Sequence, residues 1–120
     1  MAIEIAPDQS LQLLRNLTFA LVRNGKPGVI PDFTFRQLVI LLIVYLDAPP
    51  HTVRGLAKKI GVTKPVVTRA LDTLGKYQLL SRRRDDFDRR NVIVQRTVKG
   101  ALYVETLGDI VVAKAAELPV

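Results

Sequence analysis

The chain has 120 residues, of which 48% are hydrophobic and 24% are charged, a composition that indicates one folded domain and excludes a disordered chain. No cysteine is present, which excludes disulfides, thiol redox switches and thiolate metal sites. The net charge of +7 is unevenly spread: residues 52–99 hold 13 of the 18 Lys and Arg but 4 of the 11 acids, which leaves +9 there and −2 elsewhere. This asymmetry favours an anionic polymer as partner. A membrane surface fits less well, because the basic stretch lacks an amphipathic helix with bulky aromatics.

The first predicted helix follows an arm up to Pro7 that is expected to be disordered or loosely held. The helix runs from a cap at Asp8 or Ser10 to about Arg23. Its apolar face is too wide for the surface of a monomer. That face is formed by Leu11, Leu14, Leu17, Thr18 and Leu21, with Leu13, Phe19, Ala20 and Val22 beside it. The segment Asn24–Pro31 holds two Gly and two Pro and is predicted to be a loop.

The segment Leu38–Leu46 consists of nine consecutive apolar residues. Its β-branched members favour a strand, but Thr34 and Gln37 are spaced as a capping box, and the length of Phe35–Leu46 favours a helix. Nine residues are too few to cross a membrane, which requires about 20, so we expect the central core helix here. The sequence Asp47–Pro50 should end it.

Two short helices joined by a tight turn come next. Thr52 is placed to cap the first, Gly61 to end it with a positive φ, and Thr63 to cap the second, with Pro65 in its first turn. Two apolar stripes are expected to be buried: Val53, Leu56, Ala57 and Ile60, and then Val67, Ala70, Leu71 and Leu74. The opposite face of the second helix could meet bases and phosphates; it carries Lys64, Pro65, Val66, Thr68, Arg69 and Thr73. This arrangement is typical of a helix-turn-helix, although a solvated amphipathic helix fits the pattern equally well on its own.

Two extended runs, Leu79–Arg84 and Asn91–Arg96, flank a polar tip. The second run alternates, with Val92 and Val94 on one side and Ile93 and Gln95 on the other. A charged hairpin directly after a helix-turn-helix is predicted to be a wing; the alternative is a solvated loop whose ion pairs contribute little. The three Asp residues of the tip would repel phosphate, so we expect one of them to hold an Arg in a posture that suits a narrow minor groove.

Thr97 is placed to cap a last helix that ends before Pro119. Its apolar stripe has no evident partner in the winged domain, so we expect this helix to pack with the first one across a twofold axis. The stripe consists of Val104, Leu107, Ile110 and Val111.

The motifs T-x-x-x-L-A-x-x-x-G-V-T-x-x-x-V-T-R-x-L-D-x-L, R-R-R-D-D-F-D-R-R and T-x-K-G follow one another in this chain. From about Phe33 to Leu107 their order resembles the MarR family of winged-helix regulators. The resemblance implies that Arg90 reaches into the minor groove while Asp88 orients the tip. It implies base or phosphate contacts from Lys64, Pro65, Val66, Thr68 and Arg69. It also implies a homodimer that binds palindromic sites, represses transcription and often responds to a small aromatic ligand, an oxidant or a metal.

The chain departs from this family at Gln78, where the pattern L-x-x-x-G-L-V has a Gly. Either Gln78 adopts a left-handed conformation at a cost of roughly 1 kcal/mol, or the recognition helix ends early at Gly75. The chain is also shorter than most members beyond Leu107, and no ligand-sensing residue stands out.

The predicted fold is therefore mainly α with a small β-hairpin (α+β). It is one domain over 1–120, with a winged helix-turn-helix core over 34–100 and dimerisation helices over 8–24 and 97–118. The predicted function is that of a homodimeric transcriptional regulator, a repressor, which binds double-stranded DNA at a palindromic operator. The alternative is a winged-helix module for protein interaction or non-specific DNA binding. The predicted DNA-binding residues are Thr52, Arg54, Thr63, Lys64, Pro65, Val66, Thr68, Arg69, Arg82, Arg84, Asp88, Arg89 and Arg90.

We do not expect this protein to be an enzyme. The sequence shows no paired carboxylates in an apolar setting, no nucleophile with a base and no Gly-rich phosphate loop. The only histidine, His51, is interpreted as a surface residue, and no metal or other cofactor is expected. The N-terminus is acidic and brief, with no signal peptide, so a cytoplasmic location is expected. A small-molecule effector finds no support in the sequence.

Overall fold

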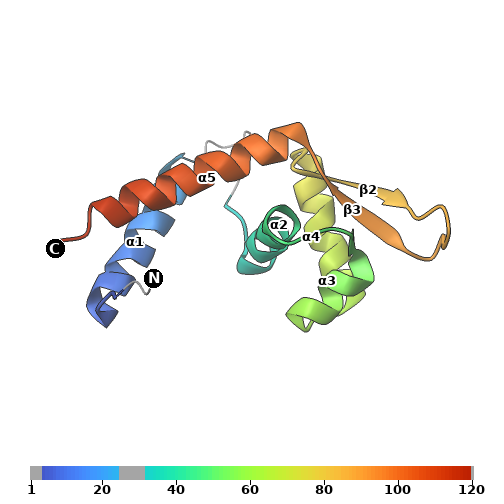
Figure 1. Cartoon of the computed structure of the whole chain (residues 1–120), viewed down its shortest axis with the longest axis horizontal. Helices are drawn as coiled ribbons and strands as arrows, with labels where there is room; N and C mark the ends of the chain where they lie inside the picture. The colour runs from blue at the N-terminus through green and yellow to red at the C-terminus, as the bar shows by residue number, and fades with distance from the viewer. Residues whose placement is uncertain (1–3, 25–31, 120) are drawn as a thin grey trace. The chain divides into compact units, whose positions relative to one another are not determined.

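The computed structural model describes residues 4–24 and 32–119. Within them, five helices and three short strands follow one another, and the strands form one antiparallel sheet in the order β1-β3-β2 (Figure 1). The predicted mainly α fold with a small β-hairpin is therefore confirmed. The elements are α1 (Pro7–Asn24), α2 (Phe35–Leu46), β1 (His51–Thr52), α3 (Val53–Ile60), α4 (Lys64–Lys76), β2 (Leu80–Arg84), β3 (Val92–Arg96) and α5 (Val98–Ala116).

The chain forms two compact units. The first, Phe33–Val104, contains α2, α3, α4 and the sheet. The second combines α1 with the part of α5 that starts at Glu105. No helix in the described ranges has both the length and the apolar character needed to cross a membrane.

Helix α2 supplies the centre of the first unit. The Thr34 hydroxyl accepts from the Gln37 amide (3.1 Å), and the Thr34 amide donates to the Gln37 side chain (2.9 Å), which confirms the predicted capping box. This cap and the burial of one face explain why the apolar run Leu38–Leu46 forms a helix and not a strand, despite its β-branched residues. The residues of α2 with no exposed surface are Ile40, Leu41 and Val44.

Helix α4 packs against both α2 and α3, and the predicted stripes of α3 and α4 enter the same core. Thr52 caps α3 by accepting from the Gly55 amide (3.0 Å), and Gly61 ends it with φ 72°, as predicted. Thr63 is the N-cap residue of α4, as predicted, but the predicted capping by its hydroxyl is wrong, because its side chain makes no capping hydrogen bond. Pro65 has no amide hydrogen to offer, and the Val66 amide donates to the Thr63 carbonyl instead (3.1 Å). The core formed by both stripes includes Val53, Leu56, Ala57, Val67, Ala70, Leu71 and Leu74.

Helix α4 continues to Lys76, and Gln78 then adopts φ 62°. Of the two alternatives, the left-handed Gln78 is therefore the correct one. Side chains from elsewhere in the unit fix this strained corner: the Thr97 hydroxyl donates to the Gln78 carbonyl (2.7 Å), and the Tyr45 hydroxyl donates to the Leu79 carbonyl (2.7 Å). Thr97 also caps α5, as predicted, by accepting from the Gly100 amide (2.9 Å).

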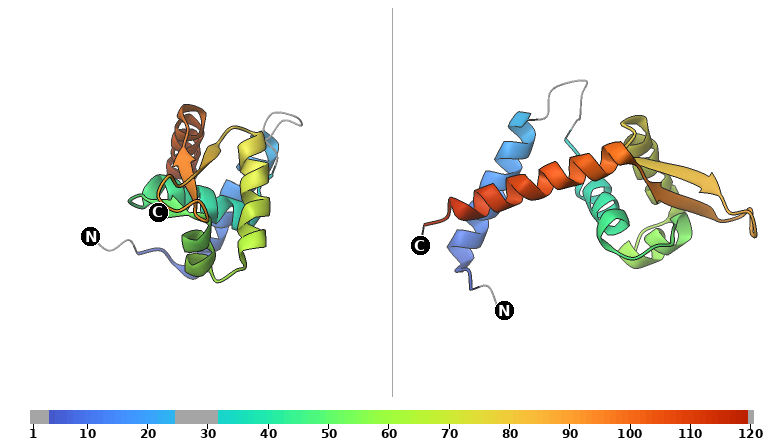
Figure 2. Two further views of the ribbon diagram at one scale, coloured as in Figure 1. Left: turned by 90° about the vertical axis from the view of Figure 1, so that its right-hand side faces the viewer. Right: turned by 45° about the horizontal axis from the view of Figure 1, so that its top comes forward.

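The hairpin of β2 and β3 extends beyond the helices of its unit, as Figure 1 and the right-hand view of Figure 2 show. Its strands lie within one residue of the predicted runs. The predicted alternation holds for Val94, which is buried, and Gln95, which is exposed. Ile93 is half-buried because it pairs with Thr52 of β1, a strand that the sequence did not predict.

His51 is the other surprise of the sheet. It pairs with Val94 and is 8% exposed, so its interpretation as a surface residue is wrong. Its ring Nε2 lies 3.1 Å from the Asp47 carbonyl, which gives the buried imidazole a polar partner.

In the second unit, α1 begins at Pro7, so the predicted caps at Asp8 and Ser10 are wrong. A proline has no amide hydrogen to satisfy and its φ is already helical, which favours it as the first helical residue. The Ser10 hydroxyl donates back to the Pro7 carbonyl (2.7 Å) from within the helix. Of the predicted loop, only Asn24 lies in α1, and residues 25–31 fall outside the described residues.

Candidate nucleic-acid interface

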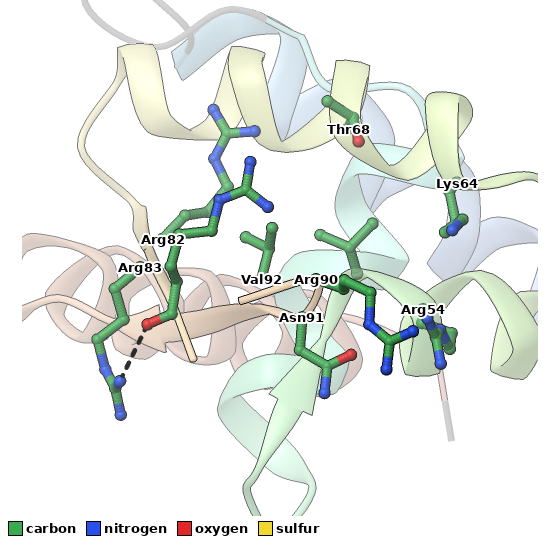
Figure 3. A pocket seen from close by; sticks show the side chains of 10 residues that line it. Arg54, Lys64, Thr68, Arg82, Arg83, Arg90, Asn91 and Val92 are labelled. Atoms are coloured by element: carbon green, nitrogen blue, oxygen red, sulfur yellow. Dashed lines mark hydrogen bonds between the residues drawn. The ribbon is translucent and has the colours of Figure 1, made fainter. Parts of the chain in front are cut away.

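A groove of about 450 Å³ lies between the start of α4 and the hairpin (Figure 3). Arg54 comes from α3, Lys64 and Thr68 come from α4, and the remaining charged side chains come from β2 and the wing tip. Six of the lining side chains are Lys or Arg, and no lining residue is acidic. The groove is lined by Val53, Arg54, Lys64, Thr68, Arg82, Arg83, Arg84, Arg90, Asn91 and Val92.

In the first two turns of α4 the polar side chains face the solvent. Lys64 and Thr68 are exposed, whereas Val67 and Leu71 on the opposite face have 0% and 1% of their surface exposed. Figure 3 shows the Lys64 and Thr68 side chains projecting from α4 at the groove. The core thus fixes the orientation of a helix face that combines a cation with a hydroxyl, the two kinds of group that bind phosphates and base edges.

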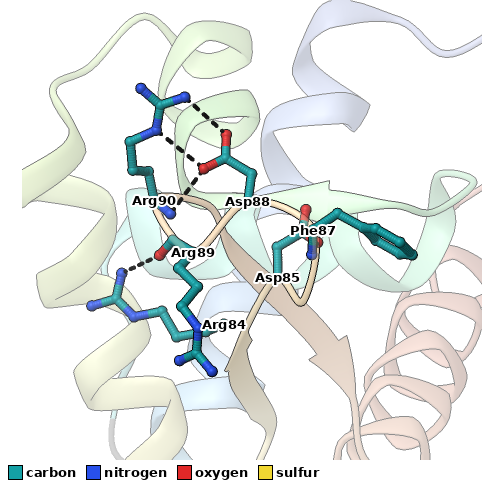
Figure 4. A network of polar contacts seen from close by, with 6 residues as sticks. All are labelled: Arg84, Asp85, Phe87, Asp88, Arg89 and Arg90. Carbon is teal, nitrogen blue, oxygen red and sulfur yellow. Dashed lines mark hydrogen bonds and ion pairs between the residues drawn. The ribbon is translucent and has the colours of Figure 1, made fainter.

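Arg90 is held at the wing tip by Asp88, as predicted. Its Nε donates to Asp88 Oδ1 (3.1 Å) and its Nη2 donates to Asp88 Oδ2 (3.3 Å) (Figure 4). The planar guanidinium therefore binds the carboxylate in a bidentate manner. The Arg90 amide also donates to Oδ1 (3.1 Å). Hydrogen bonds from the Arg90 side chain and amide hold the pKa of Asp88 below its ordinary value of 3.8, and the positive charge of Arg54 lowers it further.

Asp88 is thus an ionised orienting group. The Arg90 side chain remains 84% exposed. The pair therefore fixes the direction of the guanidinium without removing it from a ligand.

The sequence model of the MarR family matches residues 33–92. The chain belongs to the MarR family. The members of this family are winged-helix transcriptional regulators that bind DNA, so the helix-turn-helix and wing predicted for this chain are confirmed.

Solved structures show the same fold. YusO from Bacillus subtilis has 22% sequence identity and a TM-score of 0.70, with 93% of this chain and 82% of YusO covered. A mutant of S. aureus MepR has 23% identity and a TM-score of 0.69, with 89% and 77% covered. Streptococcus pneumoniae FabT, solved in complex with DNA, has 22% identity and a TM-score of 0.64, with 92% and 72% covered. No curated protein sequence matches the chain.

Six of the predicted DNA-binding residues of this MarR-family chain line the groove: Arg54, Lys64, Thr68, Arg82, Arg84 and Arg90. Asp88 forms an ion pair with Arg90, and Arg89 is the neighbouring residue of Arg90 at the tip. The remaining predicted residues lie outside the groove lining: Thr52, Thr63, Pro65, Val66 and Arg69. The Thr52 hydroxyl is engaged in capping α3.

Besides Arg90, the groove arginines Arg82 and Arg84 also make hydrogen bonds within the protein. Arg82 Nη2 lies 2.7 Å from Asp72 Oδ1 of α4, and this pair joins the wing to the recognition helix. Arg84 Nη1 donates to the Arg89 carbonyl (3.0 Å) at the tip. Both side chains therefore stiffen the hairpin as well as add to its positive charge.

Arg83 and Asn91 line the groove of this MarR-family chain but were not among the predicted site residues. Strand alternation places Arg83 on the face opposite Arg82, yet its long side chain lies along the strand, with Nη1 3.4 Å from the Arg84 carbonyl. The uninterrupted run of three arginines was the available signal. Within the described residues, no cluster of three or more His, Asp or Glu could hold a metal ion.

Proposed function

We propose that the chain is a sequence-specific repressor that binds a palindromic operator in double-stranded DNA as a homodimer. In this proposal α4 enters the major groove and the wing enters the adjacent minor groove. The observation that carries it is Arg90, held by Asp88 at the edge of a groove lined by six Lys and Arg side chains.

The face of α4 supports reading of bases in the major groove. Thr68 carries a short hydroxyl among cations, so it can approach a base edge while Lys64 and Arg54, which line the same groove, contact phosphates. The phosphate contacts supply affinity that falls with salt, and the hydroxyl supplies preference between bases.

The wing supports the minor-groove assignment. A narrow minor groove has an enhanced negative potential that attracts arginine, and a guanidinium fixed in advance loses less conformational freedom on entering it. Arg90 meets both conditions, since it is exposed and yet held by Asp88.

Exposed apolar residues on α1 support the homodimer. Leu11, Leu14, Phe19 and Val22 are each more than half exposed, as is Val112 on α5. A second copy is the proposed cover for these residues, because twofold dimers are the commonest assemblies and a symmetric dimer explains a palindromic site. The solved FabT structure contains DNA on the same fold, which further supports DNA as the partner.

The test is selection of bound sequences from random duplexes, with the mass of the free protein measured in parallel. We expect an inverted repeat and the mass of a dimer. A promoter fusion carrying the selected repeat should then lose expression when the protein is present. Binding without any enriched sequence would favour the alternative, a winged-helix module for protein interaction or non-specific DNA binding.

A further inference from the structure

The apex of the wing carries an aromatic side chain that the fold does not use. Phe87 is exposed to 101% of its reference surface, more than any other large hydrophobic residue in the described part of the chain. A ring this exposed has its whole apolar surface available to a partner, and its transfer out of water into such a contact is favourable.

The backbone beneath Phe87 is fixed. Its amide donates to Asp85 Oδ1 (2.9 Å), the Asp85 amide donates to the Asn91 carbonyl (3.0 Å), and the Asn91 amide donates to the Asp88 carbonyl (2.9 Å). The turn that presents Phe87 is thus the turn that presents Arg90. Figure 4 shows the two side chains on opposite sides of the tip.

The charge of the apex differs from that of the strand behind it. Residues 85–90, which follow β2, contain two Arg and three Asp, a formal charge of −1, whereas β2 ends in three consecutive arginines. An apex without net positive charge has little attraction for phosphate. Phe87 is the side chain of this apex that can make an apolar contact with the deoxyribose walls of a minor groove.

We infer that Phe87 contacts the deoxyribose wall of the minor groove opposite the wall that Arg90 faces, and that it makes the wing selective for groove width. This inference rests on the proposed function, since it requires the wing to enter DNA. Apolar side chains are known to wedge into minor grooves and to favour base steps that deform easily. Phe87 would therefore add a preference at base pairs flanking those that α4 reads.

The first test compares Phe87→Ala, Phe87→Leu and Phe87→Tyr with the wild type on the duplex selected by the wild-type protein. A lost apolar contact should weaken binding by roughly tenfold per wing for Ala and less for Leu. The slope of log K against log salt should not change, because no phosphate contact is lost. Tyr, which keeps the ring, should bind nearly as the wild type does.

The matched control is Phe35→Ala, which removes a phenyl ring that is 84% exposed on α2, away from the wing. It should leave the affinity unchanged, and light scattering should give all variants the same mass. Hydroxyl-radical cleavage then locates the contact, because the radical attacks deoxyribose in the minor groove. Phe87→Ala should expose sugars that the wild type protects beside the Arg90 contact.

Several outcomes would overturn the inference. Wild-type affinity and an unchanged cleavage pattern for Phe87→Ala would show that the ring does not touch DNA. A lower mass for Phe87→Ala with normal DNA affinity would assign the ring to a contact between protein copies. If Arg90→Ala is as silent as Phe87→Ala, the proposed function itself fails; if only Arg90→Ala weakens binding, the failure is confined to Phe87.

Discussion

Asp88 and Arg90 act as one unit at the wing tip, so they should not respond to substitution as independent charges. If the wing supplied only positive potential, Asp88→Asn would strengthen binding and Arg90→Lys would be nearly silent. Because Asp88 holds the guanidinium through two side-chain hydrogen bonds, we predict the reverse. Asp88→Asn should weaken operator binding, and Arg90→Lys should weaken it by roughly tenfold, since an ammonium lacks the planar fork.

The affinity of both variants for the operator is measured by titration over a salt series. Asp86→Asn is the control, because it removes a tip carboxylate outside the Arg90 pair.

The pKa of Asp88 lies below 3.8, so the carboxylate keeps its charge as the pH falls toward that value. The ion pair with Arg90 is lost only as the pH falls through the lower pKa of the folded protein. Tighter binding by Asp88→Asn would leave only a basic hairpin.

The two faces of α4 give a second prediction at the scale of single residues. Leu71 is 1% exposed and Thr68 is exposed at the groove. Leu71→Ala should lower the free energy of unfolding by roughly 2 to 5 kcal/mol. Thr68→Ala should leave stability unchanged and relax the preference between operator sequences. Urea unfolding and competition with mutated duplexes separate the two effects, and equal unfolding midpoints would contradict the facial assignment.

At the scale of elements, the end of α4 is built around a strained residue. Gln78 holds φ 62°, a conformation that glycine adopts freely and that costs other residues roughly 1 kcal/mol. Gln78→Gly should therefore raise the free energy of unfolding by up to about 1 kcal/mol. Lys76→Gly, two residues earlier at the last position of the helix, should instead lower it, by up to about 1 kcal/mol. Urea unfolding of both variants measures the difference, and destabilisation by Gln78→Gly would mean that its side chain contributes more than the strain costs.

The helices and the hairpin could be predicted because their signals are local. The stripe from Val67 to Leu74 follows helical periodicity, and the box of Thr34 and Gln37 identifies one helix start from residues three positions apart. At the site, the Asp88 and Arg90 pair could likewise be predicted, because its two members are only two residues apart.

What could not be predicted depends on distant partners or on competition between neighbours. The strand β1 exists because His51 and Thr52 pair with residues more than forty positions later, and that pairing buries His51. Thr63 has the residue type of a cap, but Pro65 removes one of the amides that it would bind. Arg83 was missed as a groove residue because its position there depends on the path of its long side chain, and strand alternation does not predict that path.

At the scale of the whole molecule, charge and apolar surface are divided along the sequence. Residues 52–99 carry a net charge of +9, and the exposed apolar residues Leu11, Leu14, Phe19 and Val22 lie on α1. This division supports the proposal that one part of the chain binds DNA and another binds a second copy of the chain.

The proposed dimer predicts that a charge on α1 separates the protomers. Leu14 is 53% exposed, so Leu14→Glu should leave the fold intact while placing a carboxylate in an apolar interface. Light scattering should then report a monomer, and binding to the inverted repeat should weaken. Arg15→Glu introduces the same side chain at the neighbouring exposed position and should remain dimeric. An unchanged mass for Leu14→Glu would place the interface elsewhere.

The most direct measurement of sequence-specific recognition by α4 and the wing is a ratio of two dissociation constants. One is measured for the selected operator and the other for a scrambled duplex of equal length and composition, both at physiological salt. A specific regulator should bind the operator at least about a thousandfold more tightly. Thr68→Ala and Arg90→Lys should each reduce that ratio. A ratio near one, with both affinities falling equally as salt rises, would contradict sequence-specific recognition.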